Sequence, residues 1–265
     1  MENVHAGWRR KLMKYIADTV DFQLEEPTVV TLGKFDGRHR GHQKLLHTME
    51  ELKETLGYAT AIFTFSTAPL SLVTGEAATV ITTSEERRHN MEKMGIDYLV
   101  EYPFTDDVRK MDPAVFVKDI LVKRMKAKAM VVGPDCSFGY KGAGNAELLE
   151  ALSGELGFQL FVIEKEKDHR RDISSTYVKE ALEAGDMELV NDLLGYRYFI
   201  SGEVLHGRRI GRTLGMPTTN LVPSTKKLLP PNGVYLSRTR IRTQAYSGVT
   251  TNSYQPTIGE TFRGV

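Results

Sequence analysis

The first part of the chain alternates short apolar runs with longer amphipathic segments. The apolar runs are rich in valine, isoleucine and phenylalanine and predict strands over residues 29–32, 59–65, 98–102, 129–133 and 159–163. The segments between them predict helices over residues 43–56, 84–94, 112–123 and 146–156, with Ser84 as an N-cap and Pro113 at the first helical position. This alternation predicts an α/β fold in which helices cover both faces of a parallel sheet.

The pattern changes beyond residue 163. The charge run over residues 164–172, EKEKDHRRD, predicts a solvated loop, and residues 177–184 predict a helix. Farther on, β-like runs at 198–205 and 233–240 are punctuated by glycine and proline. We therefore expect two domains, residues 13–194 and 195–265.

Composition narrows the functional class. The chain has 35 lysines and arginines against 34 acidic residues, so nothing indicates a nucleic-acid partner or a membrane surface. No apolar run approaches the ~20 residues of a membrane helix. The chain has one cysteine, Cys136, which excludes an internal disulfide and fits a reducing, cytoplasmic location. The sequence does not indicate an oligomeric state.

Residues 29–46, VVTLGKFDGRHRGHQKLL, carry the clearest chemistry. A β-branched run ends at Gly33, a glycine-bearing turn follows, and His39, Gly41 and His42 precede a helical pattern. A helix N-terminus offers free N–H groups to phosphate, and nearby imidazoles can donate hydrogen bonds to its oxygens. A surface pair and half of a zinc site are the alternatives, and a single cysteine and no second histidine pair at ligand spacing disfavour zinc. The segment predicts a nucleotide triphosphate site.

Four segments in this order resemble the bacterial bifunctional riboflavin kinase/FMN adenylyltransferases, or FAD synthetases. Residues 33–42, GKFDGRHRGH, are similar to the family's adenylyltransferase signature, and 131–145, VVGPDCSFGYKGAGN, to its second flavin-and-nucleotide loop. ISST at 173–176 is similar to its Ile-Ser-Ser-Thr-x-x-Arg element, and GRTLGMPTTN at 211–220 to the kinase module's Pro-Thr-x-Asn motif. The resemblance extends from about Met13 to the last residue.

The resemblance implies a Rossmann-like HxGH nucleotidyltransferase domain followed by an incomplete antiparallel β-barrel of the riboflavin kinase type. The implied reaction is adenylyl transfer from ATP to FMN, which yields FAD and pyrophosphate with Mg²⁺ as cofactor; the kinase module would convert riboflavin to FMN. The implied catalytic residues are His39, His42 and Lys179. The implied ATP-binding residues are Gly33, Phe35, Asp36, Gly37, Gly41, Ser174, Ser175 and Thr176. Asp135 is expected to bind flavin, and Gly211, Thr218 and Asn220 to approach the kinase ATP, with Thr218 as a Mg²⁺ ligand.

The chain departs from the family pattern at several positions. Lys179 stands where the family usually has arginine, which keeps the charge and loses the bidentate fork. Cys136 replaces an aromatic residue, and residues 64–69, TFSTAP, lack the histidine of a Pro-His-Pro motif, so we expect altered flavin affinity. Residues 1–12 precede the usual family start, and we expect them to come from an upstream start codon or a ragged tail.

The end of the chain is a further departure. The sequence stops before the position of the family's catalytic glutamate, a role that Glu260 does not fill. We therefore expect the kinase half to be incomplete, weakly folded and inactive, with an open barrel edge.

Two alternatives to FMN adenylylation remain open. One is another nucleotidyltransferase of the same fold, acting on pantetheine phosphate or nicotinamide mononucleotide; the flavin-type second loop and the PTTN module disfavour it. The other is a catalytically lapsed flavin- or nucleotide-binding protein, which the departures at Lys179, Cys136 and Ala68 favour. Such a protein would bind both ligands without releasing pyrophosphate.

Overall fold

The computed structural model describes residues 12–66, 79–205, 218–257 and 260–264. The expectations for residues 1–11, for the family histidine near Ala68 and for Gly211 lie outside this range. The chain divides into two compact units, one of residues 1–78 and 84–173 and the other of residues 79–83 and 174–265.

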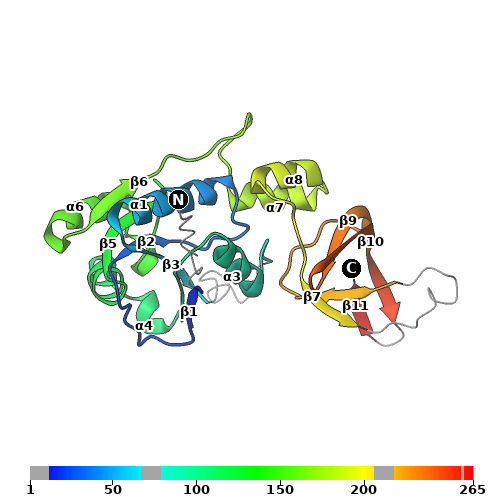
Figure 1. Cartoon of the computed structure of the whole chain (residues 1–265), viewed down its shortest axis with the longest axis horizontal. Helices are drawn as coiled ribbons and strands as arrows, with labels where there is room; N and C mark the ends of the chain where they lie inside the picture. The colour runs from blue at the N-terminus through cyan, green and yellow to red at the C-terminus, as the bar shows by residue number, and fades with distance from the viewer. Residues whose placement is uncertain (1–11, 67–78, 206–217, 258–259, 265) are drawn as a thin grey trace, which may run out of the picture. The chain divides into compact units, whose positions relative to one another are not determined.

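The first unit holds a parallel sheet of six strands in the order β1-β4-β3-β2-β5-β6 (Figure 1). The strands are β1 (Lys14–Ala17), β2 (Thr28–Leu32), β3 (Ala59–Phe65), β4 (Tyr98–Tyr102), β5 (Ala127–Val132) and β6 (Gln159–Val162). The predicted α/β fold is confirmed, and each predicted strand lies within two residues of its expected ends. The short edge strand β1 carried no alternating pattern and was not predicted.

Helical elements cover both faces of this sheet. They are α1 (Arg40–Leu56), α3 (Ser84–Lys93), α4 (Asp106–Arg109), α5 (Pro113–Val115), the π-helix η1 (Phe116–Arg124), the 3₁₀ turn η2 (Tyr140–Gly142) and α6 (Ala146–Leu156). On one face, Leu46 of α1 and Met91 of α3 pack in a cluster with Val29. On the other face, Leu149 of α6 packs with Val30. Neighbouring residues of β2 thus point into opposite cores, as alternation along a strand requires.

Helix starts differ from the sequence predictions. Helix α1 begins at Arg40, three residues before the expected start, because His39 caps it. Helix α3 includes Ser84 as its first residue, so the predicted N-cap role of Ser84 is wrong by one position. The helix predicted from residue 112 starts as α5, where Asp112 caps the first turn, and continues as the π-helix η1.

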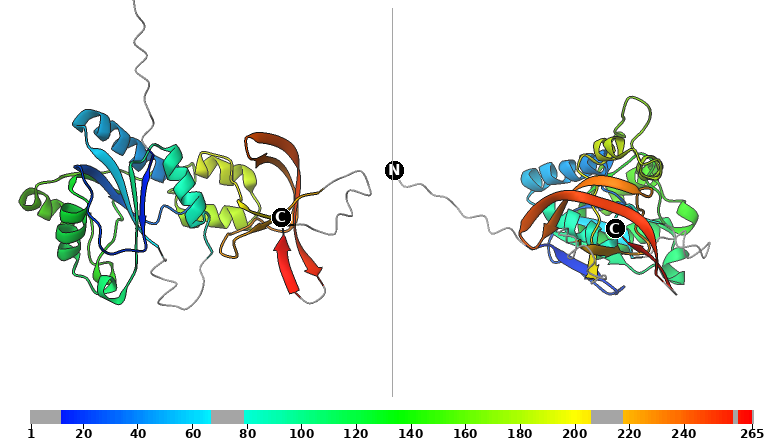
Figure 2. Two further views of the ribbon diagram at one scale, coloured as in Figure 1. Left: turned by 60° about the horizontal axis from the view of Figure 1, so that its bottom comes forward. Right: turned by 90° about the vertical axis from the view of Figure 1, so that its right-hand side faces the viewer.

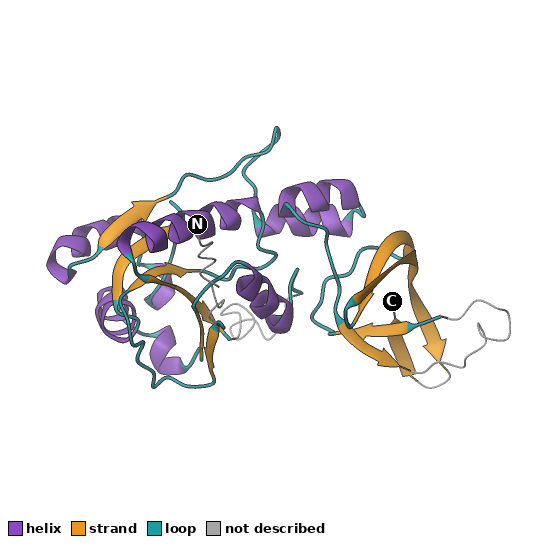
Figure 3. Ribbon diagram, viewed as in Figure 1, coloured by secondary structure: helices purple, strands orange, loops and turns teal. Residues whose placement is uncertain are grey.

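The second unit contains two helices followed by antiparallel strands (Figure 3). Its elements are α7 (Ser175–Glu183), α8 (Met187–Leu194), β7 (Gly202–Leu205), β8 (Asn220–Pro223), β9 (Gly233–Ile241), β10 (Gln244–Thr257) and β11 (Glu260–Gly264). Strand β10 pairs antiparallel with β9 and β11, and β7 with β8, which confirms the antiparallel prediction. The β9–β10 hairpin is long and curved (Figure 2), and its Val234 and Leu236 side chains are exposed.

Residues 79–83 also belong to the second unit. Val80 forms a β-bridge with Lys227, whose side chain is buried. The Lys227 ammonium donates to the carbonyl of Ile81 at 2.6 Å and lies 4.5 Å from the Tyr198 ring centroid. No helix in the described ranges has the length and apolar character needed to cross a membrane.

Candidate functional site

The loop between β2 and α1 has an unusual backbone. Gly33 follows the last residue of β2 and donates its N–H to the carbonyl of Phe63 on the neighbouring strand at 3.1 Å. Beyond it, Phe35, Gly37 and Arg38 all have positive φ angles of 49°, 82° and 39°. Two of these residues are not glycine, and such conformations are costly and concentrate at functional sites. The loop buries Phe35 and carries the chain sharply into the helix start.

His39 and His42 form a stacked pair at that start. Their ring centroids are 3.8 Å apart with an angle of 23° between the planes, and the Phe35 ring lies 4.9 Å from His42. His39 is 7% exposed, and its Nδ1 accepts the backbone N–H of His42 at 3.4 Å, which makes it the helix cap. The Nδ1 atom of His42 is buried and has no hydrogen-bond partner within the described residues.

Burial keeps both imidazoles neutral. It lowers the pKa of His39 to about 4, against a smaller opposing effect of the Asp135 carboxylate. Burial also holds the pKa of His42 well below its usual value, and the neighbouring His39 acts in the same direction. Because His39 Nδ1 accepts a hydrogen bond, the neutral ring carries its proton on Nε2. His39 therefore has an N–H donor that does not depend on a positive charge.

Gly41 permits this arrangement. A Cβ at this position would lie 3.2 Å from His39 Nδ1 and 3.5 Å from the carbonyl of Ile173. A larger side chain would therefore crowd the cap. The helix start combines its positive dipole end and first-turn N–H groups with two neutral imidazoles, which suits a phosphate group.

Asp135 lies on the loop after β5, the strand that pairs with β2. Its carboxylate acts electrostatically on His39, and its Oδ2 atom is 3.0 Å from Lys165 Nζ. The adjacent Cys136 is partly buried; burial first, then Asp135 and Glu147, raise the pKa of its thiol to about 11. The structure thus places Asp135, the predicted flavin residue, after the strand next to β2, and it disfavours a reactive thiol at Cys136.

The predicted triphosphate residues near α7 fall in the second unit. Ser174 caps α7, and its hydroxyl accepts the N–H of Tyr177 at 3.2 Å, which is the ordinary capping role. Ser175 and Thr176 form the first turn. Lys179 donates to the backbone carbonyl of Thr79. Their roles toward ATP stay predictions.

The predicted kinase-module residues lie before and in β8. Thr218 is exposed, and Asn220 begins β8 opposite Leu205. Gly211 lies outside the described residues. Among the described residues, no group of three or more His, Cys, Asp or Glu could hold a metal ion.

Sequence reasoning missed an ion pair that supports the loop. Arg87 of α3 pairs with Glu101 of β4, and these side chains are only 12% and 5% exposed. The Arg87 guanidinium also donates to the carbonyl of Lys34 at 3.2 Å, and the hydroxyl of Tyr15 donates to Glu101 at 2.6 Å. The network fastens the strained β2–α1 loop to the sheet. No local sequence signal marks it, because its members are far apart in the chain.

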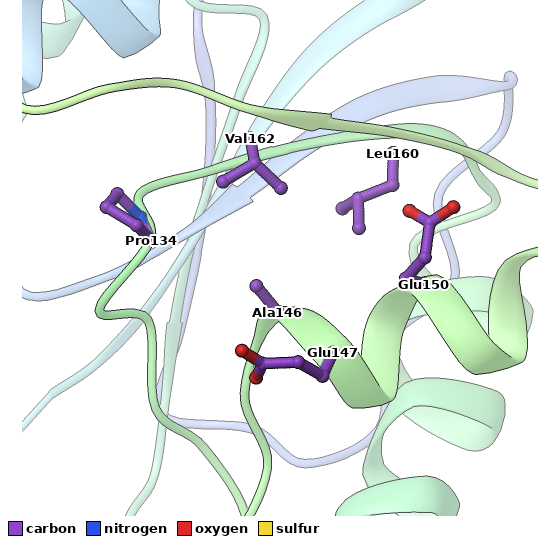
Figure 4. Close-up of a pocket in the computed structure, with 6 residues that line it drawn as sticks. All are labelled: Pro134, Ala146, Glu147, Glu150, Leu160 and Val162. Atoms are coloured by element: carbon purple, nitrogen blue, oxygen red, sulfur yellow. The ribbon is translucent and has the colours of Figure 1, made fainter.

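A shallow cavity of about 300 Å³ lies next to the Asp135 loop (Figure 4). Leu160 and Val162 of β6 form its apolar side, and Glu147 and Glu150 project from α6. Pro134, which precedes Asp135 in the chain, also lines the cavity.

Comparisons with known proteins agree with this architecture. Residues 21–177 match the family model described as FAD synthetase, and residues 194–265 match that described as riboflavin kinase. The chain is 35% identical over 237 residues to the bifunctional riboflavin kinase/FMN adenylyltransferase of Bacillus subtilis (strain 168), covering 88% of this chain and 74% of the relative. It is 34% identical over 212 residues to the protein of the same description from Escherichia coli (strain K12), covering 80% and 67%.

One solved structure also matches over most of the chain. The crystal structure described as a macrolide-efflux protein from Streptococcus pneumoniae has a TM-score of 0.82 and 26% identity, over 96% of this chain and 83% of that chain. This likeness supports the fold of each unit, taken by itself.

Proposed function

The chain belongs to the family of bifunctional riboflavin kinase/FMN adenylyltransferases, and we propose that residues 13–194 transfer the adenylyl group of ATP to FMN. An oxygen of the FMN phosphate would attack the α-phosphorus of ATP. The bond from that phosphorus to its bridging oxygen would break, and pyrophosphate would leave with the electron pair. The observation that carries this proposal is the neutral, stacked pair of the buried His39 and the partly buried His42 at the start of α1.

The protein's contribution is alignment and charge stabilisation. The attacking phosphate is already anionic at neutral pH, so the reaction needs no general base. Two phosphate-bearing substrates repel each other, and donors held at the helix start lower the free energy of bringing them together. We assign that role to His39 and His42, with Gly33, Phe35, Asp36, Gly37 and Gly41 shaping the ATP loop. Lys179 and the hydroxyls of Ser174, Ser175 and Thr176 stay the residues that we propose to bind the triphosphate.

Mg²⁺ is part of the proposal. Because no acidic or histidine cluster lies among the described residues, we expect the ion to be held chiefly by the triphosphate, as Mg²⁺ commonly is. When bound, Mg²⁺ would neutralise part of the phosphate charge. The cytoplasmic location also stays a prediction.

Flavin chromatography after incubation with ATP and Mg²⁺ tests the proposal. A tube with FMN should yield FAD and an equal amount of pyrophosphate. Binding of FMN and ATP without pyrophosphate would instead indicate a lapsed binding protein. A second tube with riboflavin reports separately on kinase activity of residues 195–265, where Thr218 and Asn220 are the proposed ATP and Mg²⁺ contacts.

A further inference from the structure

The charged loop over residues 164–172 is fastened across the start of α1. Arg40 Nη2 lies 3.0 Å from Glu166 Oε1, and Lys44 Nζ donates to the carbonyl of Glu164 at 3.1 Å. The loop thus contacts two side chains of the first turns of the helix that carries the histidine pair. We name this segment, residues 164–172, the charged strap.

The backbone of the charged strap is well defined. Lys167 and Asp172 face each other in an antiparallel β-bridge. Asp168 Oδ1 accepts the N–H groups of Arg170 and Arg171 at 2.7 and 2.8 Å, which closes the turn. The side chains of the strap are therefore presented from fixed positions.

Lys165 is the strap residue that reaches toward the site. Its ammonium lies 3.0 Å from Asp135 Oδ2 and 3.7 Å from Asp172 Oδ2. Asp135 acts on His39 and follows β5, whose carboxyl end lies beside that of β2. The Lys165 ammonium is therefore held next to the predicted phosphate site by the Asp135 carboxylate. Without this lysine, the carboxylate would repel two polyanionic substrates.

The ion pair that holds Lys165 is easily exchanged. The side chains of Lys165 and Asp135 are 37% and 70% exposed, and exposed pairs of this kind contribute little to stability. A phosphate carries more charge than a carboxylate and forms stronger charge-assisted hydrogen bonds. A bound phosphate can therefore displace the carboxylates from the ammonium at small cost.

We propose that Lys165 is a phosphate-binding residue of the adenylyltransferase site, whose ammonium moves from Asp135 and Asp172 to a phosphate of the bound substrate. The ligand chemistry is a phosphate group, carried by ATP or by FMN. The proposal rests on the proposed function.

The test compares Lys165→Gln with Lys167→Gln. Both variants remove one positive charge from the same strap, but Lys167 is 72% exposed and contacts only Asp172 among these carboxylates. Lys165→Gln should lower kcat/KM for ATP or for FMN about 10- to 100-fold, the worth of a hydrogen bond to a charged group. Lys167→Gln should change either value less than about twofold. The substrate whose KM rises identifies the phosphate, and Lys165→Arg should recover most of the loss. Equal effects of the two glutamine variants would overturn the proposal.

A double variant distinguishes a direct contact between Lys165 and phosphate from simple neutralisation of the Asp135 charge by Lys165. If Lys165 only cancels the charge of Asp135, Lys165→Gln should weaken binding of the identified substrate in the wild-type background but not in the Asp135→Asn background. If Lys165 contacts phosphate, Lys165→Gln weakens binding in both backgrounds, as we expect. Isothermal titration with ATP and with FMN measures this independently of turnover. A wild-type protein that makes no FAD would therefore contradict the proposed function, while the titrations would still decide the role of Lys165.

Discussion

Phe138 and Gly144 face each other in an antiparallel β-bridge that closes the loop after β5. The N–H of Phe138 donates to the carbonyl of Gly144 at 3.0 Å, and the reverse bond is 2.9 Å long. A Cβ on Gly144 would lie 2.3 Å from the Phe138 ring, which is part of the core. The conformation of the loop that carries Asp135 thus requires a glycine at position 144, where the backbone packs against the Phe138 ring.

Gly144→Ala should destabilise the protein by about 1–3 kcal/mol, because the Phe138 ring must leave its packed position. Gly154→Ala is the matched control, since nothing lies within 4 Å of its added Cβ in the interior of α6. That control should stabilise the protein by about 0.5–1 kcal/mol, because alanine favours the helix. Urea unfolding of both variants checks the pair. A neutral Gly144→Ala would contradict the packing described for Phe138.

Arg87→Met should be strongly destabilising, by about 3–5 kcal/mol, because Glu101 would remain buried without its charged partner. Arg88→Met on the same helix removes a guanidinium that lies 4.8 Å from the Tyr15 ring, and should cost about 1 kcal/mol or less. Thermal melting distinguishes the two. Similar losses for both variants would show that the Arg87–Glu101 pair does not support the β2–α1 loop.

Acid should weaken the fold through the histidine pair. The folded pKa of His39 is about 4, against about 6.5 in an unfolded chain, so the unfolded state binds the extra proton first. The stability from keeping His39 neutral is complete above pH 6.5 and is lost as the pH falls toward 4. At pH 5 the loss should be about 2 kcal/mol.

The His39→Asn variant isolates this contribution. The difference in free energy of unfolding between wild type and His39→Asn should be about 2 kcal/mol smaller at pH 5 than at pH 7. An unchanged difference at the two pH values would mean that His39 titrates normally.

The single thiol should react slowly. Cys136 has a pKa raised to about 11 by burial and by the nearby carboxylates of Asp135 and Glu147. At pH 8 its thiolate fraction is about 100-fold below that of an ordinary cysteine, and alkylation by iodoacetamide should slow accordingly. Mass spectrometry reads the single site directly, because the chain has one cysteine. Labelling as fast as free cysteine would refute the burial of this thiol.

The sheet was predictable from local pattern, whereas the site was predictable only in part. The β-branched run ending at Gly33 defined β2 because buried parallel strands are continuously apolar. The start of α1 was missed because its cap is a histidine, outside the usual capping residues. The ion pairs of Arg87 and Lys165 join residues distant in the chain, so no local period marks them.

The charged strap, residues 164–172, likewise has contacts that local sequence pattern does not predict. Its loop conformation was predicted correctly, but the charge pattern assigned no partners to its side chains. Its contacts to Arg40 and Asp135 depend on tertiary structure that a charge pattern does not encode.

The central claim is that the stacked histidine pair promotes adenylyl transfer. The turnover of His42→Ala tests this claim most directly. His47→Ala is the matched control, because His47 lies exposed on the same helix. With saturating ATP and FMN, His42→Ala should form FAD at least about 100-fold more slowly, while its Kd for FMN changes less than about threefold. His47→Ala should match wild type in both values. FAD formation by His42→Ala at the wild-type rate would contradict the claim.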